Sequence, residues 1–122
     1  SIGHFVRPMI FTDVPDDARL AREEVFGPVA AVFPFSTEAE ALARANATEM
    51  GLAAFVFSRD VSRCWRVADG LHAGIVGIND PLPSVAFAPM GGVKQSGLGR
   101  EGASIGLEEF TESKYLAWRI AP

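Results

Sequence analysis

The stretch LAAFVFSRDVSRCWRVADGLHAGIVGIN, residues 52–79, decides the predicted fold. It holds two short apolar runs, residues 52–58 and 75–79, on either side of a segment with helical periodicity, residues 60–74. Asp60 suits a helix N-cap, because its side chain can accept a hydrogen bond from a free backbone N–H. Two apolar strands joined by a helix are typical of a parallel sheet, since parallel strands need a long crossover. The stretch therefore predicts a strand–helix–strand unit.

The residues before this unit repeat its pattern. The apolar run at residues 29–35 predicts another strand, and residues 36–51 predict another helix. Thr37 and Glu40 form a capping box at the start of that helix, and Gly51 suits the position just after its end. Repeated units of this kind predict an α/β fold, a parallel sheet flanked by helices. Each helix has an apolar face that would cover the sheet. On the first helix this face carries Ala39, Leu42, Ala43 and Ala47, and on the second it carries Val61, Cys64, Trp65, Ala68 and Leu71.

The two ends of the chain have different patterns. Residues 5–12 contain Pro8 and predict an edge strand or an extended lead-in, and residues 16–22 predict a short helix. Residues 80–102 are rich in proline and glycine and predict an irregular loop, which in a compact domain is usually functional. The last segments are predicted as a short helix over residues 103–112 and a half-buried strand over residues 114–120.

Composition argues against several classes of protein. With 122 residues, 48% apolar and 21% charged, the chain is expected to be a soluble globular domain with one core. Its net charge of −4 is spread along the chain, so we expect no surface for nucleic acid. No apolar run is long enough for a membrane span, and the first residues lack a signal-peptide pattern.

Few residues suggest chemistry of their own. Cys64 is the single cysteine, which suits a reducing cytoplasm, and its place on an apolar helix face favours a buried, inert thiol over a nucleophile. His4 and His72 stand far apart, with no Cys or acid at ligand spacing, so no metal site is expected. Asn46 is predicted on the inner side of its helix, where it would tie down a loop carbonyl.

The segment GLGREG, residues 97–102, matches the G-x-G-x-x-G fingerprint of dinucleotide-binding folds. That fingerprint follows a strand and opens a helix within a βαβ unit. The preceding PMGGVKQS predicts no strand, and no βαβ unit follows, so loop geometry is the favoured reason for these glycines. Phosphate binding by an unrelated nucleotide-binding α/β domain is the alternative.

Three motifs closely resemble the C-terminal portion of the NAD(P)-dependent aldehyde dehydrogenase superfamily: EEVFGPV at 23–29, FAPMGGVKQSGLGREG at 87–102 and GLEEFTESKY at 106–115. Their order and spacing agree with the family, and the resemblance covers the chain from about Gly3 to Ile120. Several motifs in the same order make it specific. The resemblance implies an enzyme that oxidises a small aldehyde to a carboxylic acid, with NAD or NADP as the cofactor of the complete protein.

The resemblance also assigns roles to two residues of the first motif. In the family, the second acid of E-E-x-F-G-P hydrogen-bonds the hydroxyls of the nicotinamide ribose, and the Phe packs by the nicotinamide ring. The matching positions are Glu24 and Phe26. A carboxylate offers two acceptors to a vicinal diol, which supports the assignment. Gly27 and Pro28 are expected to fix the turn that aims Glu24, while Glu23 is expected to be a solvated helix-end acid.

No catalytic residue is expected in this chain. The family's catalytic cysteine, general-base glutamate, oxyanion-hole asparagine and nucleotide-binding half lie upstream of the matching portion, and Cys64 matches none of them. The resemblance thus implies the C-terminal part of an enzyme that acts through a cysteine thioester, inactive by itself. A non-catalytic assembly or regulatory fragment is the alternative.

Within the family, the segment from residue 77 to residue 102 is most similar to the succinate-semialdehyde dehydrogenase branch. In that branch a serine of the final loop contacts the substrate carboxylate, and Ser84 is the matching position. Met90 stands where many relatives have Phe, and is also expected at the substrate site. Pro81 and Pro83 depart from the usual loop of the branch. The similarity to this branch implies succinate semialdehyde as the expected substrate, although these two prolines do not follow the pattern of the branch.

The end of the chain is expected to mediate assembly. Residues 1–111 would form the C-terminal part of the catalytic domain and residues 112–122 an oligomerisation strand, which in the family joins the sheet of a neighbouring subunit. This implies a homo-oligomer formed through residues 114–120. One face of the predicted strand carries Leu116, Trp118 and Ile120. The alternative is that the strand folds back on its own domain.

Overall fold

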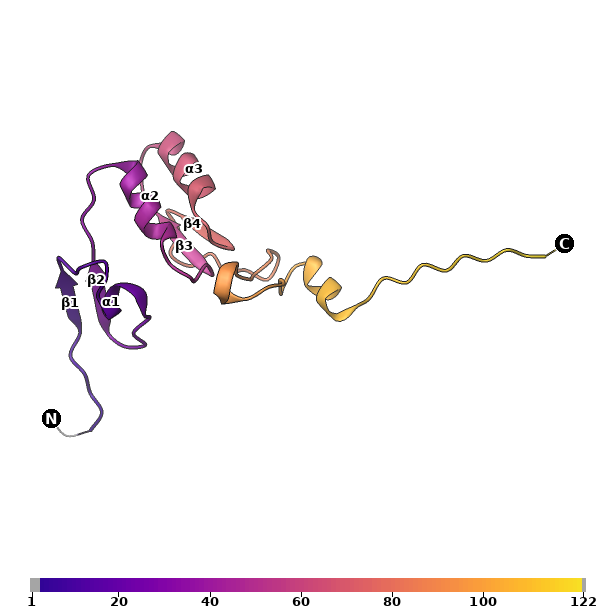
Figure 1. Ribbon diagram of the computed structural model, residues 1–122, viewed down its shortest axis with the longest axis horizontal. Helices are drawn as coiled ribbons and strands as arrows, with labels where there is room; N and C mark the ends of the chain where they lie inside the picture. The colour runs from indigo at the N-terminus through magenta and orange to yellow at the C-terminus, as the bar shows by residue number, and fades with distance from the viewer. Residues whose placement is uncertain (1–2, 122) are drawn as a thin grey trace. The chain divides into compact units, whose positions relative to one another are not determined.

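Two units make up the chain in the computed structural model, which describes residues 3–121. The first unit ends at Thr48 and the second begins at Glu49. Each unit contains one pair of parallel strands with helices beside it in the sequence (Figure 1). The predicted division at residues 111 and 112, between the catalytic-domain part and the oligomerisation strand, stays a prediction.

The first unit contains β1 (Met9–Thr12), α1 (Arg19–Arg22), β2 (Val29–Val32) and α2 (Glu38–Asn46). Strands β1 and β2 lie side by side in parallel, with Met9 opposite Val29 and Thr12 opposite Val32. Strand β1 begins directly after Pro8, whose missing N–H cannot join a ladder. All four elements were predicted, and each is shorter than the segment predicted for it.

The capping box of α2 is confirmed. Thr37 is the N-cap, and its hydroxyl accepts a hydrogen bond from the Glu40 N–H at 3.1 Å. The Glu40 carboxylate reaches back and accepts from the Ser36 N–H at 2.9 Å. The predicted end of this helix is wrong, because α2 stops at Asn46 with Ala47 as its C-cap. Gly51 is therefore not a helix-terminating glycine.

The second unit contains β3 (Ala53–Val56), α3 (Val61–Gly70) and β4 (Ile75–Ile78). Strands β3 and β4 pair in parallel, with Ala53 opposite Ile75 and Val56 opposite Ile78, and α3 packs on both. Asp60 caps α3 by accepting from the Arg63 N–H at 3.0 Å. The strand–helix–strand prediction for residues 52–79 is confirmed.

Gly51 and Gly74 are required by close backbone contacts. The Gly51 carbonyl accepts hydrogen bonds from the N–H groups of Gly74 and Val93, both at 3.0 Å. A Cβ on Gly51 would lie 2.8 Å from the His72 carbonyl oxygen, and one on Gly74 only 1.8 Å from that of Gly91. These two glycines let the loop after β4 lie against the starts of β3 and β4.

The α/β class and the parallel pairing of strands are confirmed. The prediction of one continuous sheet is wrong for residues 3–121. Their strands make two separate two-stranded sheets, β1 with β2 and β3 with β4. The apolar runs specified strand positions, while the choice of neighbour depends on contacts between distant segments. No helix among these residues is long and apolar enough to cross a bilayer.

The predicted core is also largely missing. Among the described residues, Cys64 is the one apolar side chain that is buried, at 5% exposure. On the predicted apolar face of α3, Val61 is 82% and Trp65 74% exposed. Ala39, Ala43 and Ala47 of the predicted α2 face are exposed as well. A two-stranded sheet is too narrow to cover a helix face, and many large apolar side chains among residues 3–121 are exposed.

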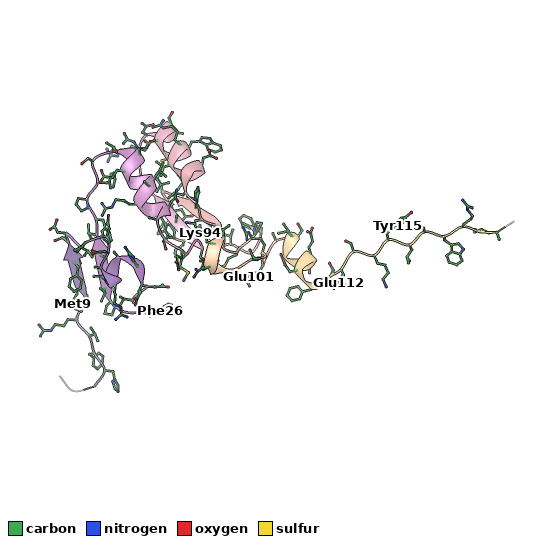
Figure 2. All side chains as sticks on the ribbon, in the orientation of Figure 1. Met9, Phe26, Lys94, Glu101, Glu112 and Tyr115 are labelled. Atoms are coloured by element: carbon green, nitrogen blue, oxygen red, sulfur yellow. The ribbon has the colours of Figure 1, made fainter. Side chains whose placement is uncertain are left out.

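The remaining residues are mostly irregular. The loop predicted over residues 80–102 contains one turn of 3₁₀-helix, η1 (Lys94–Ser96), and the predicted helix after it is a second 3₁₀-helix, η2 (Ile105–Phe110). Residues 112–121 form no strand, which differs from the half-buried strand predicted over 114–120. Trp118 is 90% exposed, and Leu116 and Ile120 are exposed too. Tyr115 is exposed as well (Figure 2). A strand needs a hydrogen-bonded neighbour, which this segment lacks within residues 3–121.

Candidate functional site

The loop with Glu24 and Phe26 joins α1 to β2 in the first unit. It makes two successive three-residue turns: the Gly27 N–H donates to the Val25 carbonyl, and the Val29 N–H donates to the Gly27 carbonyl, both at 2.8 Å. The Pro28 carbonyl then accepts from the Met9 N–H at 2.9 Å, which ties the loop to β1. The loop is therefore fixed at its β2 end by backbone hydrogen bonds.

The two adjacent acids differ in their partners. The Glu23 carboxylate accepts two hydrogen bonds from the Arg19 guanidinium, Nε to Oε1 at 2.9 Å and Nη2 to Oε2 at 2.7 Å. These hydrogen bonds hold the pKa of Glu23 below its ordinary value. The Glu24 carboxylate is exposed and accepts no hydrogen bond from residues 3–121. Of the pair, Glu24 is the acid with both oxygens available to a ligand.

Phe26 projects from the same loop, where its ring is 95% exposed (Figure 2). Phe26 and Glu24 are two residues apart in this loop and both are exposed, so the loop offers an apolar ring surface and two hydrogen-bond acceptors. Such a pair fits a ligand with an adjacent ring and diol. Gly27 has no special conformation, and a Cβ there would meet only Val25 at 4.0 Å, so nothing within the described residues requires glycine at this position.

Ser84 and Met90, the two predicted substrate residues, are brought together in the second unit. The Ser84 hydroxyl donates to the Met90 sulfur at 3.7 Å. Met90 and Glu101 are bridged in antiparallel fashion by N–H···O hydrogen bonds of 2.8 and 2.7 Å. At the start of the loop, Asp80 accepts from the Leu82 N–H at 2.9 Å. Ser84 is exposed and Met90 is half-buried.

The glycines of GLGREG serve the loop, as predicted. Gly97, Gly99 and Gly102 have φ angles of +103°, +85° and +72°, which favour glycine. The segment lies between η1 and η2, with neither a strand before it nor an α-helix after it, as a dinucleotide fingerprint requires. The Arg100 guanidinium donates to the carbonyls of Gly92 at 2.8 Å and Gly99 at 2.7 Å, so the loop is held by its own residues.

Cys64 lies at the corner where β3 and β4 end. Its thiol donates to the Ser58 carbonyl at 3.5 Å, and its burial agrees with the predicted structural role. Asn79, at φ +54°, bonds both backbone groups of Ser58 at 2.9 Å. An open hollow beside this corner is lined by Phe57, Ser58, Arg59, Val61, Cys64, Ile78 and Asn79. Among residues 3–121 no three His, Cys, Asp or Glu side chains are placed to hold a metal ion.

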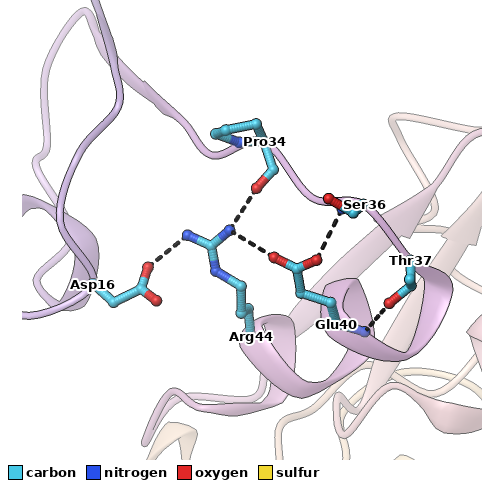
Figure 3. Close-up of polar contacts among 6 residues, drawn as sticks. All are labelled: Asp16, Pro34, Ser36, Thr37, Glu40 and Arg44. Atoms are coloured by element: carbon cyan, nitrogen blue, oxygen red, sulfur yellow. Dashed lines mark hydrogen bonds and ion pairs between the residues drawn. The ribbon is translucent and has the colours of Figure 1, made fainter.

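The sequence did not reveal a polar cluster around Arg44 in the first unit (Figure 3). The Arg44 guanidinium donates to an Asp16 carboxylate oxygen at 2.5 Å and to the Pro34 carbonyl at 2.6 Å. It lies 3.9 Å from Glu40 and 5.4 Å from the centre of the Phe33 ring. The Glu40–Arg44 spacing of four residues was visible in the sequence, but the contact with Asp16 was not. Asn46, which was predicted to bond a loop carbonyl, is half-buried at the end of α2.

In comparison with known proteins, this chain is similar to semialdehyde dehydrogenases. A succinate-semialdehyde dehydrogenase (NADP(+)) of Escherichia coli (strain K12) is 51% identical, and a glutarate-semialdehyde dehydrogenase of Pseudomonas putida is 53% identical, each over 114 residues. Both matches cover 93% of this chain and 24% of the relative. The chain therefore spans about a quarter of the length of these relatives.

The fold comparison agrees with the sequence comparison. A betaine aldehyde dehydrogenase of Staphylococcus aureus, solved in complex with NAD+, superimposes with a TM-score of 0.84 at 49% identity. The match covers 87% of this chain and 21% of that structure. The alternative of an unrelated domain that binds phosphate through GLGREG is thus wrong. Residues 1–116 match the aldehyde dehydrogenase family, and the chain belongs to that family.

Proposed function

We propose that this chain is the C-terminal part of an NAD(P)-dependent aldehyde dehydrogenase, which oxidises an aldehyde to a carboxylic acid. Within it, Glu24 binds the nicotinamide ribose and Phe26 packs by the nicotinamide ring. The observation that carries the proposal is a loop anchored by backbone hydrogen bonds that bears the exposed, unengaged Glu24 carboxylate and, two residues later, the exposed Phe26 ring. The similarity to a quarter of longer dehydrogenases supports it.

The chemistry of Glu24 suits a ribose. Its two oxygens can each accept a hydrogen bond from one of two adjacent hydroxyls, and a charged acceptor strengthens both bonds. Each oxygen of Glu23 already accepts a hydrogen bond from Arg19, whereas those of Glu24 accept none from residues 3–121. Phe26 supplies an apolar face that keeps water from one side of the ring beside it. When bound, NAD or NADP supplies the acceptor for the hydride of the aldehyde.

The choice between NAD and NADP is not made by these residues. A relative of this chain carries NADP(+) in its name, and a solved relative holds NAD+. Glu24 and Phe26 would contact the nicotinamide half, which is the same in both cofactors. The family resemblance places the nucleotide-binding half upstream of this portion, so selection between the two cofactors belongs there.

The catalytic cysteine is proposed to lie outside this chain. Cys64 is the single cysteine, and it is buried with its thiol directed at the Ser58 carbonyl. A thiol nucleophile must be reachable by the aldehyde and supported by a neighbouring base or positive charge. The chain by itself is therefore proposed to be inactive, with an upstream cysteine forming the thioester in the complete enzyme.

We propose a small aldehyde with a carboxylate at its other end, such as succinate semialdehyde, as the substrate. The names of the two relatives above are those of semialdehyde dehydrogenases, and both semialdehydes end in a carboxylate. The Ser84 hydroxyl is exposed, and its present acceptor is a thioether sulfur, a weak one. Exchange of that sulfur for a charged carboxylate would strengthen the hydrogen bond. The betaine aldehyde dehydrogenase at 49% identity shows that overall identity does not select the aldehyde, so the proposal rests on Ser84.

Assembly is the last part of the proposal. Residues 114–120 would form a strand against a neighbouring subunit and make the enzyme a homo-oligomer. Their exposed apolar side chains, together with those of α3, support an origin in a larger protein that covers them. A cytoplasmic location is proposed from the single cysteine. The alternative, a non-catalytic assembly or regulatory fragment, is favoured by the same exposed surfaces and by the lack of a nucleophile.

One experiment separates these two functions. The complete protein, with this chain in place, is incubated with succinate semialdehyde and NAD+ or NADP+, and NAD(P)H formation is followed by absorbance. Formation of NAD(P)H that is strongly reduced by Glu24→Gln supports the enzyme. Absence of NAD(P)H with any aldehyde, in a protein that still associates through this chain, supports the assembly fragment.

A further inference from the structure

Arg44 lies on α2, outside the loop that carries Glu24. Its guanidinium nevertheless bonds residues on both sides of that loop in the sequence. One nitrogen, Nη2, bonds the Asp16 carboxylate before α1, and the other, Nη1, bonds the Pro34 carbonyl after β2. The chain between these two points contains α1, the loop with Glu24 and all of β2. The Arg44 side chain thus binds both ends of the segment formed by residues 16–34 (Figure 3).

Asp16, at one end of this segment, is linked to the Glu24 loop through Arg22. The Asp16 backbone carbonyl accepts a hydrogen bond from Arg22 Nε at 3.1 Å. Arg22 is the last residue of α1 and precedes the two acids. Helix α1 has four residues and no side-chain cap, and a helix this short is not stable by itself. Its position, and with it the start of the Glu24 loop, therefore depends on the contacts of Asp16.

Arg44 itself is held in place. Its side chain is only partly exposed, with the guanidinium 5.4 Å from the centre of the Phe33 ring. Glu40, whose other oxygen bonds the Ser36 N–H, lies 3.9 Å from Nη1. The planar guanidinium can therefore bond two acceptors in different directions while it packs on the ring, which an ammonium group cannot do.

We propose that Arg44 is a positioning residue for cofactor binding: by binding Asp16 and Pro34 together it sets the place of Glu24 against the nicotinamide ribose. The inference rests on the proposed function. Arg44 touches no part of the cofactor in it, and acts through the segment of residues 16–34. Loss of Arg44 leaves the Glu24 carboxylate intact but lets its loop occupy more positions, so that less of the protein is ready to bind.

The test compares Arg44→Ala and Asp16→Asn in the complete enzyme, each with Glu24 and with Glu24→Gln. Asp16→Asn keeps the size of the side chain and spares α2, so it remains informative if Arg44→Ala does not fold. The dissociation constant for the cofactor is measured by titration, without any turnover. Arg7→Ala serves as the matched control, because Arg7 is an exposed arginine of the same unit outside the cluster.

We expect Arg44→Ala and Asp16→Asn to weaken cofactor binding about threefold to tenfold when Glu24 is present, and to have little further effect in the Glu24→Gln background. Arg44→Lys should recover part of the binding, and Arg7→Ala should bind as the wild type does. Amide hydrogen exchange of residues 23–28 in the cofactor-free protein should become faster in the Arg44 and Asp16 variants alone.

The outcomes keep the two proposals apart. Equal losses in both Glu24 backgrounds would show that Arg44 supports the fold in general and would overturn this inference alone, as would unchanged binding in both the Arg44 and Asp16 variants. Wild-type binding by Glu24→Gln would overturn the proposed role of Glu24, and this inference with it.

Discussion

The Arg19 guanidinium and the Glu23 carboxylate form a two-pronged ion pair, at 2.9 and 2.7 Å, while the next residue, Glu24, accepts no hydrogen bond from residues 3–121. Two identical side chains in succession thus have different chemistry. The difference arises because Glu23, the C-cap of α1, is four residues after Arg19 and so lies within reach of its guanidinium. Glu24 is one residue further along the chain and lacks this spacing to Arg19.

This contrast predicts unequal effects of two matched substitutions in the complete enzyme. Glu24→Gln removes a charged acceptor, and a hydrogen bond to a charged group contributes about 1.5–3 kcal/mol, so turnover should fall roughly tenfold to a hundredfold. The melting temperature should change little, because Glu24 bonds nothing in the described structure. Glu23→Gln is the control and should change turnover far less, since exposed ion pairs contribute little. Equal rates for wild type, Glu24→Gln and Glu24→Ala would remove Glu24 from the site.

The cap of α3 predicts a dependence on pH. The pKa of Asp60 is lowered, mainly because its carboxylate accepts from the Arg63 N–H. A carboxyl whose pKa is lower when folded stabilises the fold above its unfolded pKa, and this stabilisation is lost as pH falls through the folded value. Helicity followed by circular dichroism should therefore decrease in acid. Asp60→Asn keeps a capping group without a charge and should flatten this part of the curve, whereas an unaltered curve would contradict it.

The chain alone should form no NAD(P)H from any aldehyde, because its one thiol is buried against the Ser58 carbonyl. Cys64→Ser and Cys64→Ala in the complete enzyme should leave the chemical step intact and affect only stability. Steady-state rates and thermal unfolding of both variants check this. Dehydrogenase activity of the 122-residue chain that disappears in Cys64→Ser would contradict it.

Ser84 should discriminate between substrates. If its hydroxyl binds the substrate carboxylate, Ser84→Ala should lower kcat/KM for succinate semialdehyde about tenfold and leave an uncharged aldehyde of equal length nearly unaffected. Met90→Leu, which removes the sulfur at 3.7 Å from the hydroxyl but keeps the volume, is the matched control. Equal losses on both aldehydes in Ser84→Ala would mean that Ser84 does not recognise a carboxylate.

The terminal segment should control association. Removal of residues 114–122 deletes the four large exposed side chains of Tyr115, Leu116, Trp118 and Ile120, and should convert an associating chain into a smaller species. Sedimentation velocity of the chain with and without these residues measures the change. The double substitution Leu116→Ser and Trp118→Ser should act in the same direction, since it keeps the backbone but removes the apolar face. A monomer in all three cases would contradict association through this segment.

The sequence by itself determined the features that depend on near neighbours. Thr37 and Asp60 were recognised as helix caps, and each accepts from an N–H three residues later. The strands at 29–32, 53–56 and 75–78 lie within the predicted apolar runs, and the glycines of GLGREG have the left-handed φ angles of a loop. The order of the family motifs identified the family. Each of these rests on residues close together in the chain, whose interactions are visible in the spacing.

Only the tertiary structure decided which distant residues meet. It pairs β2 with β1, not with β3, and it leaves Trp65 exposed where a periodic pattern predicted a covered face. It places the Asp16 carboxylate on Arg44, 28 residues away. Periodicity shows which side of an element is apolar, but not what lies against it. That depends on chain segments brought together by folding, and for most apolar faces of this chain no such segment lies within residues 3–121.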